Sequence, residues 1–240
     1  GFTCPHRDGT LGSDGCYYCN ENGFANFKDT KISLREQIIT SMQYTRKRFK
    51  AEKFIAYFQN ATNTYASTEE LQSNYDVIRE FPDIVGLSIS TRPDCIDDEK
   101  LDLIESYSSD YDVWIEYGLQ SIHDKTLKLI NRQHDAEQFI NAVKITLTRN
   151  IKTAAHVILG LPGESKTEMI ETAKALSLLD IHGLKIHAFH ILGKTRFHQL
   201  FDEGKIRLLK EDEYVRIVCD FLEYIKPKCV IMRLVSNADK

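Results

Sequence analysis

The sequence lacks any uninterrupted apolar run of 18 residues, about the shortest length that carries an α-helix across a bilayer. We therefore predict no membrane partner. The chain also has little net charge, because 31 lysines and arginines face 35 aspartates and glutamates, which leaves −4 at pH 7. This balance supplies no overall field that attracts phosphate, so a nucleic acid would have to be bound by a local patch.

One basic segment could form such a patch. Its five cations lie close together: Arg46, Lys47, Arg48, Lys50 and Lys53. The alternative is a solvated helix end whose cations oppose the helix dipole, which is the usual explanation of a charge run.

A recognisable start is also missing. The chain begins at Gly1 without a Met or a basic and then apolar leader, and at Cys4 it is already inside a motif. We expect that residues 1–240 form a single core domain, because 240 residues can hold one large core without subdivision. We also expect this domain to lack its natural N-terminus and a part of its C-terminus.

Cysteine is scarce, and its distribution argues against disulfide bonds. Three of the six cysteines lie within the first nineteen residues, whereas Cys95, Cys219 and Cys229 are scattered. A long chain with ample core rarely needs disulfides, and a clustered set in a chain without a leader indicates metal binding or redox chemistry. We therefore expect a cytoplasmic protein in which the three scattered cysteines are dispensable.

Short apolar runs rich in β-branched and aromatic residues predict buried parallel strands. These runs cover residues 54–58, 84–89, 113–117, 154–159 and 184–188. Their starts are about 30 to 40 residues apart, which is the length of a β-α unit. Repeated units of this kind predict a parallel sheet, either open or curled into a barrel.

Amphipathic helical patterns lie before, between and after these runs. Three apolar stripes mark them: Leu34, Ile38, Met42 and Phe49; Met169, Ile170, Ala173 and Leu176; Tyr214, Val218, Phe221 and Ile225.

Polar or glycine-rich segments follow the predicted strands. They cover residues 59–65, 90–94, 118–121, 160–164 and 189–195. Parallel α/β folds place their sites at the carboxyl ends of the strands, so we predict that these segments line one site. The Gly-Leu-Pro-Gly-Glu turn at 160–164 is also explained by the need to turn from a strand into a helix.

The first cysteines form a C-x11-C-x2-C motif at Cys4, Cys16 and Cys19, with three glycines in the long gap. Glycines allow positive φ and bring backbone amides close to an inorganic centre. Three thiolates are one fewer than a full [4Fe-4S] ligand set, which would leave one iron open to a small molecule. The spacing alone leaves two alternatives: a structural zinc site completed by His6 or a distant cysteine, and a redox C-x-x-C pair.

The motif and six later segments together resemble the radical S-adenosylmethionine (SAM) superfamily, and more specifically its Elp3-like YhcC/YtqA family. These segments cover residues 57–60, 62–65, 90–94, 116–121, 131–134 and 156–164. The resemblance covers nearly the whole chain. It implies a radical SAM enzyme with a [4Fe-4S] cluster, on an α/β fold that is a partial (β/α)6 TIM-like barrel.

The resemblance implies roles for residues of the first two units. Cys4, Cys16 and Cys19 match the cluster ligands, and Tyr18 matches an aromatic residue against the adenine side of S-adenosyl-L-methionine. Three residues occupy the place of a Gly-Gly-Glu-like turn that meets the methionine amino group in many relatives: Gln59, Asn60 and Thr62. This chain lacks those glycines, so the groups that replace them stay open.

Further SAM contacts are implied on later strands. Ser90 matches a contact to the ribose or the amino group. Gln120 and Arg132 match a pair whose guanidinium binds the methionine carboxylate. His156 matches a residue that holds the ribose hydroxyls. The alternatives are a cation on a helix surface for Arg132 and a core histidine with satisfied hydrogen bonds for His156.

Four basic side chains lie on or after the last predicted strand: Lys185, His187, His190 and Lys194. Strand alternation points Lys185 and His187 to one face, which in a barrel of this kind faces the substrate chamber. A buried lysine is costly unless it is paired, so an ordinary structural role is the alternative.

In this family, reductive cleavage of SAM by the cluster yields a 5′-deoxyadenosyl radical, with electrons from a donor such as flavodoxin or ferredoxin. No protein acid or base is needed for that step, so we name no catalytic residue beyond the cluster ligands. YtqA-type members are associated with tRNA wobble-uridine modification, carboxymethylaminomethyl to aminomethyl, and we predict a tRNA substrate. The alternatives are a small metabolite, or a non-catalytic zinc or redox-sensing protein.

Overall fold

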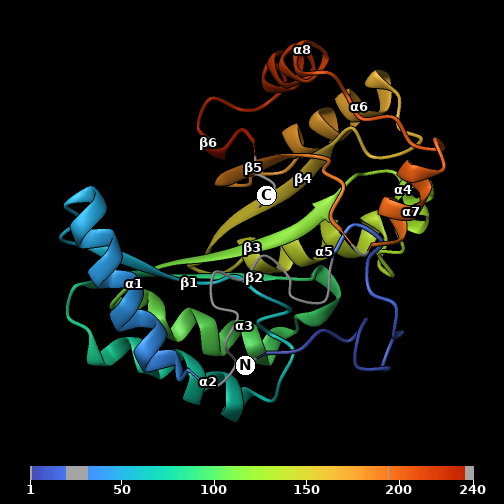
Figure 1. Ribbon diagram of the computed structural model, residues 1–240. Coiled ribbons are helices and arrows are strands. Elements are labelled where there is room, and N and C mark those ends of the chain that lie inside the picture. Colours follow the sequence, from blue (N-terminus) through green and yellow to red (C-terminus); the bar gives the residue numbers. More distant parts are fainter. Residues whose placement is uncertain (1, 20–31, 194, 236–240) are drawn as a thin grey trace.

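The protein, seen in a computed structural model, is built on one sheet of six parallel strands in the order β1-β2-β3-β4-β5-β6 (Figure 1). The structure describes residues 2–19, 32–193 and 195–235. The strands are β1 (Phe54–Phe58), β2 (Ile84–Thr91), β3 (Asp112–Gln120), β4 (Lys152–Leu159), β5 (Gly183–Ala188) and β6 (Val230–Arg233). Each strand pairs in parallel with the next, so the predicted α/β partial barrel is confirmed.

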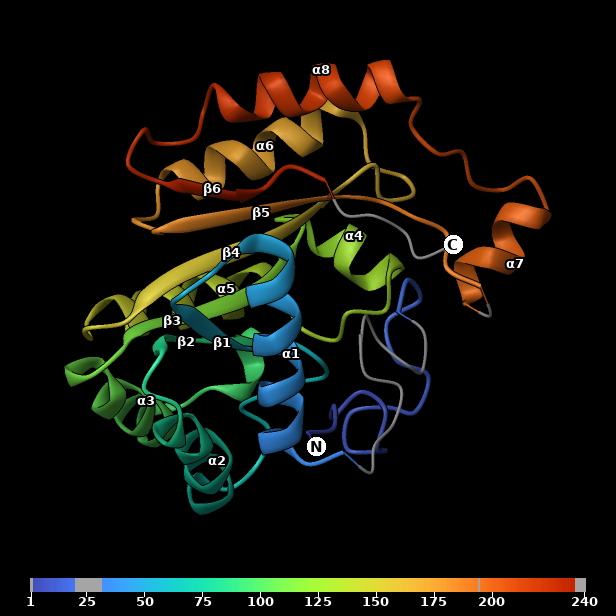
Figure 2. The ribbon, with the colours of Figure 1, turned by 60° about the vertical axis from the view of Figure 1, so that its left-hand side comes forward.

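Helices cover the outer face of the sheet, as Figures 1 and 2 show. Those on this face are α2 (Thr68–Tyr75), α3 (Asp98–Glu105), α5 (Ala136–Leu147), α6 (Lys166–Ser177) and α8 (Glu211–Leu222). The others are α1 (Leu34–Phe49), α4 (Asp124–Leu129) and α7 (Arg196–Asp202), with short 3-10 turns η1 (Asp76–Glu80), η2 (Pro93–Cys95) and η3 (Ser106–Ser109). Helices α4 and α7 lie at the carboxyl end of the strands, beside the cysteine loop.

Local sequence explains where several helices begin. Ser33 accepts a hydrogen bond from the backbone of Glu36, whose carboxylate accepts one from the backbone of Ser33, and this capping box starts α1. Ser165 and Glu168 start α6 in the same way. Each box satisfies two backbone donors that a helix start leaves without partners.

Two apolar clusters hold the fold together. The larger one packs the outer side of the strands, such as Ile115 and Tyr117, against residues of the covering helices, such as Phe139. The smaller one lies at the carboxyl ends of the strands, where Phe189 and Phe197 pack among residues of α4 and α7 and against Tyr17. The second cluster therefore anchors the end of the cysteine loop to the barrel.

The structure corrects two predicted helix faces and adds one strand. Phe49 ends α1 with 65% of its surface exposed, so it does not belong to the inner stripe. Helix α8 ends at Leu222, and Ile225 lies in the turn beyond it. Strand β6 was not recognised as an apolar run because only four residues form it.

The basic segment lies at the amino-terminal edge of the sheet, where α1 leads into β1. Arg46 pairs with Asp83, just before β2, at 2.5 Å and stacks on the Phe54 ring at 5.0 Å. Lys53 lies 3.5 Å from the same carboxylate. Two of the five cations of the basic segment, Arg46 and Lys53, are therefore partly neutralised.

Among the described helices, none combines the length and apolar character needed to cross a membrane.

Candidate active site at the carboxyl ends of the strands

The cysteine loop, residues 4–19, crosses the carboxyl ends of the strands and is attached on both sides. The Thr62 amide, after β1, donates a hydrogen bond to the Thr3 carbonyl at 3.0 Å. The side-chain amide of Asn131, after α4, donates to the Gly15 carbonyl at 2.9 Å. Partners distant in the sequence thus fix both ends of the loop, and the loop occupies the predicted site.

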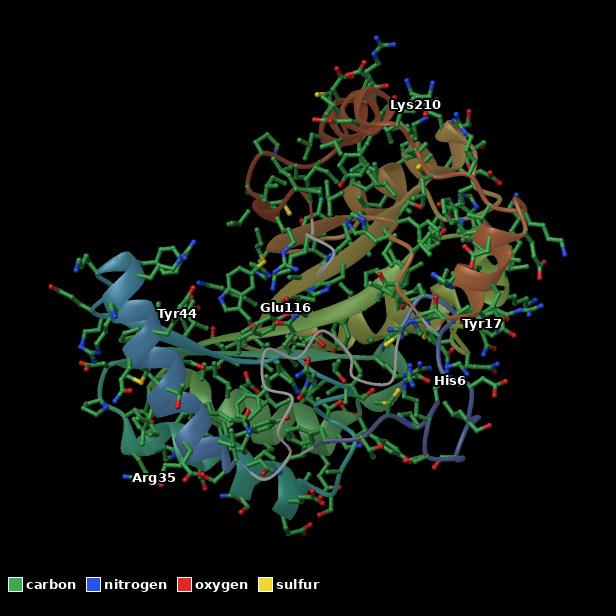
Figure 3. All side chains as sticks on the ribbon, in the orientation of Figure 1. His6, Tyr17, Arg35, Tyr44, Glu116 and Lys210 are labelled. Atoms are coloured by element: carbon green, nitrogen blue, oxygen red, sulfur yellow. The ribbon has the colours of Figure 1, made fainter. Side chains whose placement is uncertain are left out.

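Two side chains fill the inside of the loop. His6, labelled in Figure 3, is only 1% exposed, and its ring lies where a Cβ on Gly12 would come within 3.0 Å. The Arg7 guanidinium donates to the Cys19 carbonyl at 2.7 Å and lies where a Cβ on Gly15 would come within 2.9 Å. Gly15 also has φ 68°, so glycine is needed there for space and for conformation.

The thiols of the loop lie in different electrostatic surroundings. Burial raises the pKa of Cys16, but the charge of Arg132 and hydrogen bonds from His6 and Arg132 more than offset it and bring the pKa to about 6. Burial and the neighbouring Cys16 thiolate raise the pKa of Cys19. Cys16 is therefore ionised near neutral pH, and thiolates are the form that binds metals.

Arg132 is buried behind this thiolate. One guanidinium nitrogen lies 3.6 Å from the Cys16 sulfur, and another donates to the Gly118 carbonyl at 3.0 Å. The Nε of Arg132 is buried and has no partner among the described residues. Arg132 is only 7% exposed and lies after α4, so the alternative of a cation on a helix surface is wrong. A Cβ on Gly118 would lie 2.6 Å from Arg132, so this glycine allows the approach.

Backbone strain is concentrated around the same arginine. Gln120, at the end of β3, has φ 74°, and Asn131 and Gln133 on either side of Arg132 have φ 55° and 61°. Residues other than glycine rarely adopt this left-handed region, and such strain persists mainly at functional positions. Within this strained region the Gln120 and Arg132 side chains both lie beside Gly118, where a Cβ would come within 2.8 Å of each.

A second buried guanidinium, Arg92, lies near the loop. It donates two hydrogen bonds to Asp94, at 2.8 and 2.9 Å, and its side chain is 3% exposed. Its Nη1 is buried without a partner in the described part of the chain. The charge of Arg92 also contributes to the lowered pKa of Cys16, so both arginines act on this thiolate. Arg92 was not among the predicted site residues.

The predicted SAM contacts on the turn after β1 differ in their exposure to solvent. Gln59 and Asn60 are exposed, whereas Thr62 is 1% exposed. The Ser90 carbonyl accepts hydrogen bonds from the amide and the side chain of Asn63, which joins this turn to the end of β2.

An ionised glutamate, Glu116, lies on the inner face of the sheet and was not predicted as a site residue. Its Oε2 accepts hydrogen bonds from Tyr57 Oη at 3.0 Å, His156 Nε2 at 2.6 Å and Lys185 Nζ at 2.5 Å. Its Oε1 accepts one from Ser88 Oγ at 2.6 Å. We call these five residues the inner-face cluster; Glu116 is labelled over the sheet in Figure 3.

Electrostatics fix the charge states in the inner-face cluster. Burial acts to raise the pKa of Glu116, but the donors from His156 and Lys185 lower it to about 2. Burial lowers the pKa of His156 and of Lys185, and the Glu116 carboxylate opposes both shifts. The consistent state is an ionised Glu116 beside the Lys185 ammonium and a neutral His156. The signal for Glu116 in the sequence was a charged residue inside an otherwise apolar strand.

The remaining predicted basic residues lie on β5 or after it. The rings of His187 and His156 are 5.4 Å apart between centroids, and burial lowers the pKa of His187 to about 3. Lys185 and His187 thus share the inner face. His190 lies beyond β5, and the predicted Lys194 lies outside the described residues.

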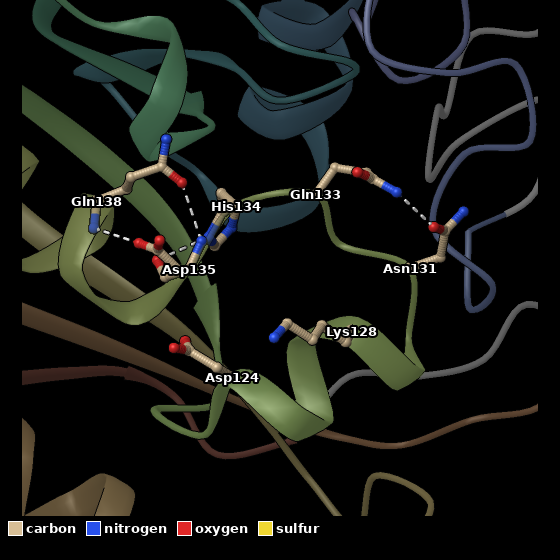
Figure 4. Close-up of a pocket in the computed structure, with 7 residues that line it drawn as sticks. All are labelled: Asp124, Lys128, Asn131, Gln133, His134, Asp135 and Gln138. Atoms are coloured by element: carbon tan, nitrogen blue, oxygen red, sulfur yellow. Dashed lines mark hydrogen bonds between the residues drawn. The ribbon is translucent and has the colours of Figure 1, made fainter.

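No three His, Cys, Asp or Glu side chains in the described ranges stand close enough together to hold a single metal ion. A cleft of about 440 Å³ lies between α4 and the start of α5, and its wall includes Asn131, which holds the cysteine loop (Figure 4). Asp124, Gln133 and Gln138 line it, and His134, also in its wall, lies 3.1 Å from the Gly118 carbonyl.

Comparison with protein families identifies the class of this protein. Residues 3–176 match the model of the radical SAM superfamily, and residues 181–240 match that of the radical SAM C-terminal domain. The chain belongs to the radical SAM superfamily. It is therefore an enzyme of the class that uses a [4Fe-4S] cluster and SAM.

Individual relatives confirm the predicted YhcC/YtqA resemblance. The uncharacterized protein MJ0486 of Methanocaldococcus jannaschii is 44% identical, over 99% of this chain and 73% of its own. YtqA of Bacillus subtilis is 38% identical over 99% of this chain and 74% of its own. YhcC of Escherichia coli is 34% identical over 99% of this chain and 76% of its own.

More distant similarities concern parts of longer proteins. A tRNA uridine(34) acetyltransferase of Methanocaldococcus infernus is 26% identical over 61% of this chain and 27% of its own. The solved Elp3 of the same organism, with an N-terminal deletion, has a TM-score of 0.71 at 17% identity, over 82% of this chain and 52% of that one. The chain thus spans about half of the solved Elp3, and this likeness concerns the fold.

Proposed function

We propose that Cys4, Cys16 and Cys19 hold the [4Fe-4S] cluster and that the enzyme modifies the wobble uridine of tRNA, converting a carboxymethylaminomethyl group to aminomethyl. The observation that carries the proposal is the cysteine loop across the strand ends, with an ionised Cys16 and two buried arginines beside it. Bound together, the cluster and SAM supply the one-electron chemistry that takes a hydrogen atom from the substrate.

The buried donors near the loop fit these cofactors. Arg132 Nε and Arg92 Nη1 are buried polar atoms without partners in the described chain, and a carboxylate such as that of SAM satisfies donors of this kind. Arg132 also stabilises the Cys16 thiolate, which keeps this ligand deprotonated. In this proposal Arg132 and Gln120 bind the methionine end of SAM.

The other proposed SAM contacts follow from their places around the loop. Tyr18 lies near both the cysteines and Arg132, because the charges of Arg132, Cys16 and Cys19 all act on it. In this proposal Ser90, near the end of β2, and His156, on β4, contact the ribose. On the turn after β1, Gln59, Asn60 and Thr62 remain the proposed contacts of the methionine amino group.

The tRNA substrate is supported by similarity. The family resemblance points to YtqA-type modification, and two of the similar proteins are named for tRNA uridine(34) acetylation or as Elp3. The enzyme would work in the cytoplasm with flavodoxin or ferredoxin as its reductant. A small metabolite is the second candidate, because the net charge of −4 provides no general attraction for RNA.

The function is tested by incubating the anaerobically reconstituted, reduced enzyme with SAM and bulk tRNA. We expect 5′-deoxyadenosine together with loss of carboxymethylaminomethyluridine and gain of aminomethyluridine, both measured by mass spectrometry of digested tRNA. Unmodified tRNA transcript is the control and should not change. Production of 5′-deoxyadenosine with no altered nucleoside would favour the small metabolite.

Replacing Arg132 with Ala is expected to weaken SAM binding by about 1.5 to 3 kcal/mol, because a charged hydrogen bond is lost. Calorimetry on cluster-loaded protein measures the affinity, and iron content is checked first because Arg132 lies 3.6 Å from the Cys16 sulfur. Arg207→Ala is the control, since Arg207 pairs with Glu213 at the surface. Equal SAM affinity of the Arg132 variant and the parent would contradict the proposed contact.

Reversing Lys47 and Arg48 to Glu tests whether the basic segment binds tRNA. Arg46 is left in place because it pairs with Asp83. We expect weaker tRNA binding and a salt dependence shallower by up to about one unit per lost phosphate contact. Filter binding at several salt concentrations measures both, with Lys144→Glu/Arg216→Glu as the control, a double charge reversal at exposed positions of α5 and α8. An unchanged salt dependence would exclude the basic segment and leave tRNA recognition to the residues around the carboxyl ends of the strands.

A further inference from the structure

We propose that the inner face of the barrel holds a carboxylate-binding site made by Lys185, His187 and Arg233, with Glu116 as the positioning residue. The site would receive the carboxylate at the end of the substrate's uridine substituent. This inference rests on the proposed function for the identity of the substrate, and on the inner-face geometry for the chemistry of the site.

Glu116 is not itself free to bind a substrate cation. Its two oxygens already accept four hydrogen bonds, from Tyr57, Ser88, His156 and Lys185. It is 1% exposed and its pKa is lowered to about 2, so it stays ionised at every pH at which the enzyme would work. Its role is to hold the surrounding donors in fixed directions.

Lys185 has donor capacity that Glu116 does not use. An ammonium carries three N–H groups, and only Glu116 accepts from it among the described residues. Its Nζ lies 4.1 Å from the centre of the Tyr57 ring, which fixes the ammonium above the sheet. The side chain is 8% exposed, so its unused N–H groups are largely shielded from water and favour a charged acceptor.

His187 and Arg233 add further donors on the same side. The Nε2 of His187 is buried without a hydrogen-bond partner in the described part of the chain. Arg233, on β6, is in register with Lys185 on β5. No carboxylate pairs with Arg233 among the described residues, and its charge acts on Tyr57, His156, Lys185 and His187.

The balance of charge on this face selects an anion. One carboxylate, Glu116, faces two cations, Lys185 and Arg233, while His156 and His187 are neutral because burial lowers the pKa of each. One positive charge is left without a counter-charge among the described residues, on a face where Lys185 is 8% exposed and Arg233 is half-buried. A bound anion would supply that counter-charge.

The depth of Glu116 and Lys185 along their strands favours a carboxylate over a phosphate of the tRNA backbone. Glu116 and Lys185 lie in the middle of β3 and β5, below the strand ends where the cysteine loop crosses. A phosphate of a polynucleotide is flanked by sugars on both sides, and that width opposes entry to mid-strand depth. A carboxylate at the tip of a thin base substituent reaches the cluster while the nucleoside stays near the loop.

The test uses cluster-loaded enzyme with SAM present and two probes, 5-carboxymethylaminomethyluridine and its methyl ester. We expect calorimetry to show that the acid binds at least about tenfold more tightly than the ester, which keeps the amine and lacks the carboxylate charge. Lys185→Met and Arg233→Met should each abolish most of this preference, and Lys185→Arg should keep part of it. Lys152→Met is the control, because Lys152 begins β4 at the opposite edge and pairs with Asp112.

Each outcome bears on one claim. Equal binding of acid and ester, no binding of either probe, or displacement of the acid by inorganic phosphate at equal concentration would overturn the carboxylate site. Loss of the preference in Arg233→Met supports the site even if Lys185→Met does not fold. Turnover of tRNA is assayed separately. If the enzyme prefers the acid probe but does not turn over tRNA, the carboxylate site stands and the proposed function is wrong. If it turns over tRNA but does not prefer the acid probe, the proposed function stands and the carboxylate site is wrong.

Discussion

A Cys16→Ala variant, reconstituted anaerobically with iron and sulfide, is expected to retain almost no bound iron. The loop offers only three thiols for the cluster, so the loss of one removes a third of the protein's ligands. Arg132 and His6 also lower the pKa of Cys16 to about 6 despite its burial, which favours the thiolate that binds iron. Iron and sulfide analysis and the visible absorption of the protein measure the result.

Cys95→Ala is the matched control for this experiment. Cys95 is buried close to the loop, in η2, but burial and the neighbouring Asp94 raise its pKa to about 12. It is therefore protonated and unsuited to bind iron. Retention of iron in Cys16→Ala together with its loss in Cys95→Ala would show that the ligand assignment is wrong, and a single tightly bound zinc in the parent protein would favour the structural alternative.

The second large effect is expected from Glu116→Ala, which should lower the free energy of unfolding by about 3 to 5 kcal/mol. The change leaves the Lys185 ammonium buried without its carboxylate and removes the acceptor of Tyr57, Ser88 and His156. Urea unfolding of iron-loaded protein at neutral pH, followed by circular dichroism, measures the difference. Glu80→Ala is the control, because its pair with Arg35 is half exposed and should contribute less than about 1 kcal/mol.

The same carboxylate predicts how stability changes in acid. The folded pKa of Glu116 is lowered from 4.5 to about 2, so its contribution is complete above pH 4.5 and is lost as the pH falls toward 2. That difference corresponds to about 3 kcal/mol. The parent should therefore lose stability more steeply than Glu116→Gln across this window. Parallel acid curves for the two proteins would contradict the ion-paired state.

Much of the fold could be predicted from the sequence because local patterns determine it. Five of the six strands are apolar runs that are long enough to recognise, and the polar segments after them mark the carboxyl edge. Helix stripes were less reliable at their ends. Phe49 and Ile225 continue the helical period, but the period does not show where the neighbouring element ends, and both positions depend on packing.

The inner-face cluster could not be predicted because its contacts are made across the sheet. Glu116 is separated in sequence from Ser88 by 28 residues, from His156 by 40 and from Lys185 by 69. The parallel register pairs Glu116 with Ser90 and Ala154 and brings Ser88, His156 and Lys185 within two residues of that level. For a related reason the sequence left Arg132 open between a SAM contact and a helix-surface cation, since its burial depends on the strained backbone around Gln120 and on the space at Gly118.

The four hydrogen bonds to Glu116 also bear on the curvature of this half-barrel. A closed barrel is held in shape by the pairing of its first and last strands, whereas here β1 and β6 are edges. The Glu116 carboxylate on β3 instead gathers side chains from β1, β2, β4 and β5 at one point inside the bend. Flattening the sheet would pull these donors away, so the interior width is set at its centre, and any widening for a large substrate must occur at the two open edges.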